Sequence, residues 1–125
     1  MSARVKPSIF DVPVSMFSCA SDTTPKPTHL SAILREIKSS KYRTDIERLR
    51  TLSPQEYDRR KKSLPAFTVA GTFYNPRRAA NLAQHSGFAV VDFDKVSHLA
   101  DTKFALKQDR YTAACFISPS GNGLK

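Results

Sequence analysis

Residues 87–94, with the sequence GFAVVDFD, constrain the fold more than any other part of this chain. An apolar run that ends in Asp92 and Asp94 predicts a buried central strand with acidic groups at its carboxyl end. In α/β sheets, binding and catalytic groups collect at that end of the strands. Because side chains alternate along a strand, we expect both carboxylates on one side and Phe93 on the other.

Two carboxylates at this spacing repel each other unless a cation lies close to both. Mg²⁺ and Mn²⁺ prefer oxygen ligands and are held by one or two carboxylates, with water and substrate phosphates as the remaining ligands. Asp92 and Asp94 are therefore candidate metal ligands and catalytic residues. A second interpretation stays open, because acids after a strand also form turns or cap a helix, here one that begins near Val96.

The composition indicates one domain with a polyanionic partner. A chain of 125 residues with 40% hydrophobic content is long enough to bury a core. Its 20 lysines and arginines against 11 acidic residues give a formal charge of +9, which favours nucleic acid or nucleotides as partners. Cys19 and Cys115 match no ligand spacing and are expected to be reduced core residues. Without a membrane-length apolar run or a signal sequence, we expect a cytoplasmic protein with no membrane partner.

Residues 1–63 are expected to form a strand followed by a basic helical region. A serine, a proline at the first helical position and a glutamate make a capping box at Ser53, so a helix is expected to start there. Residues 8–18, which contain Pro13, are expected to form an edge strand or two short strands split by a bulge. The other expected elements are a loop over 21–27, a helix over 28–38 with Thr28 as its cap and a helical segment over 42–49. The cations Arg59, Arg60, Lys61 and Lys62 are adjacent and would gain from a nucleic-acid phosphate backbone, although a solvated helix face explains them as well.

Residues 64–125 are expected to form an α/β half that carries the motifs. The pattern predicts strands over 64–73 and 112–117, a short helix over 79–84 and a longer helix over 96–108. Arg77 and Arg78 precede the short helix, where the helix dipole disfavours cations. They are therefore candidate nucleotide- or phosphate-binding residues, with Arg78 the better match, unless they simply extend into water.

The last residues, 118–125, read SPSGNGLK and follow the predicted final strand. Backbone N–H groups in such a turn can face a phosphate, and hydroxyls and an ammonium can complete the site. The order of the glycines differs from that of a Walker loop, and an ordinary glycine-rich turn is the alternative. The candidate nucleotide-binding residues are Ser118, Ser120, Gly121, Asn122, Gly123 and Lys125.

The two motifs together resemble the archaeo-eukaryotic primase and primase-polymerase superfamily, in which an Asp-x-Asp motif precedes a small-residue turn that closes on a basic residue. The chain is more closely similar to the VirE amino-terminal domain family of mobile elements, often found upstream of a helicase-like region. That likeness covers about the second half and rests on both motifs and on residues 64–66, 71–73, Arg78 and 85–87.

The resemblance implies that Asp92 and Asp94 bind a divalent metal and that residues 118–125 contact the phosphates of a nucleoside triphosphate. Lys125 stands where the superfamily has histidine; it can neutralise phosphate but does not relay protons at neutral pH. The superfamily's third acidic motif does not occur before the sequence stops, so we expect a fragment, truncated at its carboxyl end, that is inactive alone. The implied whole protein is a nucleotidyltransferase that replicates mobile-element or phage DNA.

The expected fold is α+β: a small mixed or antiparallel sheet with helices on one face, as in RNA-recognition-like cores. Two other functions remain open. The first is a non-catalytic nucleic-acid-binding domain, whose binding would fall with salt and ignore metal. The second is a phosphohydrolase, because residues 90–96 also resemble the opening motif of the haloacid dehalogenase superfamily, with Asp92 as nucleophile and Asp94 as acid and base.

Overall fold

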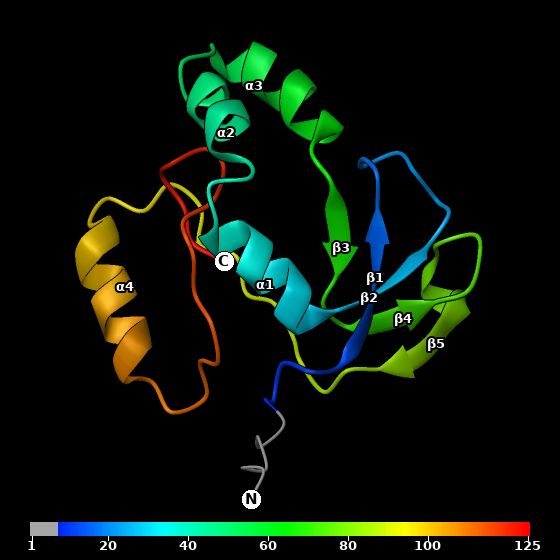
Figure 1. The fold of residues 1–125 in the computed structure, drawn as a ribbon. Coiled ribbons are helices and arrows are strands. Elements are labelled where there is room, and N and C mark those ends of the chain that lie inside the picture. Colours follow the sequence, from blue (N-terminus) through cyan, green and yellow to red (C-terminus); the bar gives the residue numbers. More distant parts are fainter. Residues whose placement is uncertain (1–7) are drawn as a thin grey trace, which may run out of the picture. The chain divides into compact units, whose positions relative to one another are not determined.

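The computed structural model describes residues 8–125 and confirms the α+β class. Two compact units make up the chain (Figure 1). The first contains the chain up to Arg43 together with Lys62–Ala89, and the second contains Thr44–Lys61 and Val90–Lys125. Each unit therefore draws on both residues 1–63 and residues 64–125, and each is described by itself.

The main sheet of the first unit has the order β2-β1-β3 and is antiparallel throughout (Figure 1). Its strands are β1 (Pro13–Phe17), β2 (Lys26–His29) and β3 (Ala66–Thr68). The predicted edge strand is thus wrong in its position, because β1 lies at the centre. Proline is tolerated there because it is the first residue of the strand, where it interrupts the hydrogen-bond ladder least. The predicted loop over 21–27 is also wrong in part, since β2 begins inside it.

The core of the first unit lies between the sheet and α1 (Leu30–Lys38). Leu30 and Ile33 of α1 are buried against Val14 of β1, and partly buried apolar side chains surround them. Apolar residues three and four apart place one face of this helix toward the sheet. The predicted helix over 28–38 is therefore confirmed apart from its first turn, which β2 occupies.

A second, two-stranded sheet pairs β4 (Gly71–Phe73) with β5 (Leu82–His85). The predicted single strand over 64–73 is wrong, because the chain leaves β3 and begins β4 at Gly71 with a φ of 151°. Glycine is required at that position, since an added Cβ would overlap the carbonyl of Gln84 on β5. The predicted helix over 79–84 is reduced to the short 3-10 turn η2 (Ala79–Asn81), after which β5 follows.

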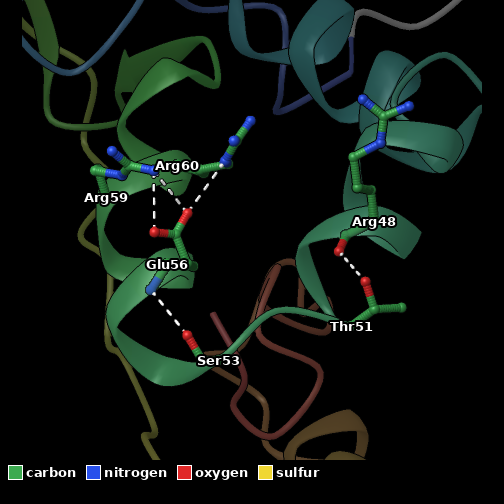
Figure 2. A network of polar contacts seen from close by, with 6 residues as sticks. All are labelled: Arg48, Thr51, Ser53, Glu56, Arg59 and Arg60. Carbon is green, nitrogen blue, oxygen red and sulfur yellow. Dashed lines mark hydrogen bonds and ion pairs between the residues drawn. The ribbon is translucent and has the colours of Figure 1, made fainter.

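Two short helices precede the η1 turn (Lys61–Ser63): α2 (Arg43–Leu49) and α3 (Pro54–Arg60), both as expected. The Ser53 side chain accepts a hydrogen bond of 3.3 Å from the N–H of Glu56, which confirms the cap (Figure 2). α4 (Leu99–Gln108) begins later than expected, because the N–H of Val96 donates to the Asn122 carbonyl at 2.8 Å. No helix within residues 8–125 is both long and apolar enough to cross a membrane.

The predicted strands over 87–94 and 112–117 are wrong, since only the isolated antiparallel bridges Phe93–Leu124 and Ile117–Leu124 form there. Val90 and Val91 are 52% and 64% exposed, so the run before the aspartates is not a buried central strand. An apolar run becomes a strand only if neighbouring backbone pairs with it, and residues 88–91 have no such pairing in the described chain.

Cys19 and Cys115 carry free thiols, as expected, but both are only partly buried, so their assignment to the core is wrong.

Candidate functional site

The acidic motif is held against the last residues of the chain, within the second unit. Phe93 and Leu124 exchange two backbone hydrogen bonds of 2.9 Å each, and Leu124 is 1% exposed. Phe116 and Lys125 exchange a similar pair, of 2.9 and 3.0 Å, on the other side of the same segment. Residues 123–125 therefore lie between the acidic motif and residues 116–118, and the two motifs found in the sequence meet.

Asp92 and Asp94 flank Phe93, so strand geometry predicts that they lie on the face opposite to the one that Phe93 shares with Leu124. Lys125 lies across from Asp92, and its Nζ is 3.0 Å from Asp92 Oδ1. Their side chains are 40% and 50% exposed, so this ion pair stabilises the fold by no more than about 1 kcal/mol. The expected common face of Asp92 and Asp94 stays a prediction, and Lys125, a predicted nucleotide-binding residue, already neutralises Asp92.

Gly123 allows the close approach of these segments. A Cβ on Gly123 would lie 2.6 Å from the carbonyl oxygen of Phe93 and 3.0 Å from Ser118 Oγ. Neither separation leaves room for a methyl group. Glycine at this position therefore has a packing reason, and the pairing of the two motifs depends on it.

The turn over residues 118–123 is closed by its own polar groups. Ser118 Oγ lies 2.9 Å from Ser120 Oγ, which donates to Asn122 Oδ1 at 2.7 Å. The N–H of Gly121 donates to the Ser118 carbonyl at 2.9 Å, and Gly121 adopts a φ of 84°. Phosphate binding through the hydroxyls and the Gly121 N–H therefore requires these internal bonds to be exchanged for bonds to the ligand.

Arg50, which follows α2, also contacts this turn. Its Nε and Nη2 donate to the carbonyls of Pro119 and Ser118, both at 3.3 Å. No local pattern in the sequence points to Arg50, because its contact joins residues that are far apart in the chain. It is the functional candidate that sequence reasoning missed.

The basic run is divided between the units, with Arg59, Arg60 and Lys61 in the second and Lys62 in the first. The Glu56 carboxylate accepts from Arg59 at 3.0 and 2.8 Å and from Arg60 at 3.5 Å (Figure 2). The hydrogen bond from Arg59 lowers the pKa of Glu56. These contacts confirm part of the alternative interpretation, a solvated helix face with ion pairs three and four residues apart.

Lys61 connects the basic run to the acidic motif electrostatically. Its Nζ pairs with Asp58 Oδ1 at 3.0 Å, and this hydrogen bond is the main reason that the pKa of Lys61 is raised. The charge of Asp94 makes the smallest of the contributions that raise this pKa.

Arg77 and Arg78 belong to the first unit. Arg77 Nη2 donates to the Ala20 carbonyl at 2.7 Å, and its guanidinium carbon lies 4.4 Å from the centre of the Phe17 ring. These contacts give Arg77 a structural role in this unit. Arg78 is exposed, as its alternative interpretation expected.

The donor set around the acidic motif fits a hard divalent cation. Asp92 and Asp94 offer exposed carboxylate oxygens, which suits Mg²⁺ or Mn²⁺ with water and phosphate as further ligands. Across residues 8–125, no three His, Cys, Asp or Glu side chains gather into a ready-made metal group. The two aspartates would hold such a metal with water and the phosphates of a bound ligand as its remaining ligands.

The fold and the site define an α+β domain in which an acidic motif faces a serine- and glycine-rich turn. The chain belongs to the family described as BT4734-like, N-terminal domain, whose sequence profile matches residues 59–125, more than half of the chain. The matched part begins at the basic run and includes both motifs. No curated protein and no solved structure matches the chain.

Proposed function

We propose that this domain binds a nucleoside triphosphate with Mg²⁺ or Mn²⁺ in a primase-polymerase-like replication protein of a mobile element or phage. The observation that supports this proposal most strongly is the pairing of residues 92–94 with residues 123–125. It brings the backbone of the acidic motif and a serine- and glycine-rich turn together, and the resemblance to the VirE amino-terminal domain family implies that these two segments bind metal and nucleotide. In the whole protein the expected reaction is nucleotidyl transfer.

Each group on this face has a defined role in the proposal. Asp92 and Asp94 hold the metal, which when bound supplies activation of the attacking hydroxyl and neutralisation of the leaving pyrophosphate. The Lys125 ammonium leaves Asp92 and pairs with the nucleotide phosphates instead. Asn122 and the serines at 118 and 120 complete the phosphate site.

Nucleic acid, most simply DNA, is the proposed second partner. The formal charge of +9 attracts a phosphate backbone, and the guanidiniums of Arg59 and Arg60 are exposed on α3 although they pair with Glu56. Exposed pairs of this kind exchange readily for phosphate contacts because they are weak. We propose that the domain acts in the cytoplasm, alongside a helicase domain in the same or a neighbouring chain.

A non-catalytic nucleic-acid-binding domain is the second candidate. The ion pair between Lys125 and Asp92 favours it, because this pair neutralises the acidic motif without a metal. The third function, a haloacid dehalogenase-type phosphohydrolase, has less support. The motif that carries this resemblance follows no strand in the described structure, because residues 88–91 form none.

Fluorescence anisotropy separates the two candidates. A labelled nucleoside triphosphate and a labelled single-stranded oligonucleotide are each titrated with the protein, with and without Mn²⁺ and over a series of salt concentrations. The proposed function predicts nucleotide binding that requires Mn²⁺, and oligonucleotide binding that weakens with salt. Oligonucleotide binding without any Mn²⁺-dependent nucleotide binding would establish the second candidate instead.

A further inference from the structure

Arg50 makes a forked contact with the turn of the candidate site. Nε and Nη2 of one guanidinium reach the carbonyls of two successive residues, Pro119 and Ser118, both at 3.3 Å. Only arginine combines a permanent charge with parallel N–H donors of this geometry. An exposed arginine normally points into water, so its contact with a segment 68 residues further along the chain indicates a specific role.

The same guanidinium fixes the shape of the turn at a second point. A Cβ on Gly121 would lie 3.1 Å from Arg50 Nε, so the glycine backbone packs directly against the arginine side chain. Gly121 has a φ of 84°, a conformation that glycine adopts without strain. Arg50 therefore covers the outside of the turn, whereas the serine hydroxyls and Asn122 bond to one another within it.

The contact also changes the electrostatics of the turn. Carbonyl oxygens carry partial negative charge, which repels phosphate, and the guanidinium pairs with two of them. With these carbonyls engaged, an anion can be bound by the turn's hydroxyls, the Gly121 amide and Lys125 once these groups exchange their present partners for it. A preorganised site of this kind binds its ligand without first having to order a flexible loop.

We infer that Arg50 is a positioning residue that holds residues 118–125 in the shape in which they receive nucleotide phosphates. The inference rests on the proposed function and adds to it a residue from outside both motifs. Arg50 acts through the turn and does not itself contact the nucleotide.

The test compares the variants Arg50→Met and Arg50→Lys with the wild-type chain. Methionine keeps the length of the side chain but removes both hydrogen bonds, so nucleotide affinity should fall about tenfold. Lysine keeps the charge and can reach one carbonyl, so it should restore affinity to within about threefold of wild type. Arg48→Met is the matched control, because Arg48 lies in the last turn of α2, two residues before Arg50, and contacts Thr51 only through its carbonyl oxygen (Figure 2).

Isothermal titration with Mn²⁺ alone and with a Mn²⁺-nucleoside triphosphate gives the two affinities for each variant. The inference predicts that Arg50→Met weakens nucleotide binding and leaves Mn²⁺ binding unchanged, a separation that general destabilisation of the fold would not produce. It also predicts that the amide NMR signals of Gly121 and Asn122 move in this variant and not in Arg48→Met.

Two results would overturn the inference, and they are distinguishable. If wild type and Arg50→Met bind nucleotide equally well, the role of Arg50 is wrong and the proposed function stands. If the folded wild-type chain binds no nucleotide at all, both are wrong.

Discussion

The ion pair between Lys125 and Asp92 predicts that lysine and metal compete for the same carboxylate. At the observed 3.0 Å, two unit charges attract by about 1.4 kcal/mol in bulk water, and exposure of both side chains reduces the net value to about 1 kcal/mol or less. A divalent metal on Asp92 competes with the ammonium, because both cations are attracted to the same carboxylate and repel each other. Lys125→Met should therefore tighten the binding of Mn²⁺ alone by up to about fivefold.

The same substitution should have the opposite effect on nucleotide, because the proposed phosphate contact is lost. Isothermal titration of Mn²⁺ alone, and then of Mn²⁺-nucleotide, measures both changes. Lys125→Arg keeps the competing cation and should leave Mn²⁺ affinity near that of wild type. Lys107→Met, at the exposed end of α4, removes one charge elsewhere and controls for the change in net charge. If Lys125→Met binds Mn²⁺ no more tightly than Lys107→Met does, the competition does not exist.

Three further predictions concern the fold. Ser53→Ala removes the cap of α3 and should lower the free energy of unfolding by about 0.5–1 kcal/mol in a urea titration. An unchanged free energy of unfolding would show that the 3.3 Å hydrogen bond does not stabilise the helix. Gly123→Ala should lower the free energy of unfolding by about 2 kcal/mol or more in the same assay, because its Cβ would lie 2.6 Å from a carbonyl oxygen. Gly87→Ala is the comparison: its Cβ would meet no atom within 4 Å, so the loss of stability should be smaller. Hydrogen bonds, mainly from the Ser18 N–H, lower the pKa of Asp22 from 3.8 to about 2. The stability that the ionised Asp22 contributes is therefore present above pH 3.8 and is lost as the pH falls toward 2. NMR titration of its carboxyl carbon should give a midpoint near 2, and a midpoint near 3.8 would contradict the assignment.

The helices could be predicted from the sequence because their signals are local. The cap at Ser53 and the spacing of Leu30 and Ile33 each lie within a few residues of the helix that they define. The strands were less predictable, since an apolar run shows neither its partner nor whether it has one. Residues 88–91 have a strand-like composition, yet in the described structure their backbone pairs with no other strand, and residues 89–91 are exposed while Phe88 stacks on Phe10.

The same distinction applies to the candidate site. Both motifs were visible as short patterns, but their contact depends on the Phe93–Leu124 pairing, which no local pattern indicates. Arg50 could not be found for the same reason. In contrast, Arg77 was a reasonable anion ligand by its position in the sequence, and its contact with the Phe17 ring became apparent only in the folded chain.

The central claim is that Asp92 and Asp94 hold a metal together with a nucleotide. The most direct test is isothermal titration of Mn²⁺ and a nucleoside triphosphate into the wild-type chain and the double variant Asp92→Asn/Asp94→Asn, with circular dichroism to establish that both are folded. The proposal predicts nucleotide binding that requires Mn²⁺ in wild type and is lost in the double variant. Equal binding by both folded proteins, or no binding by either, would contradict it.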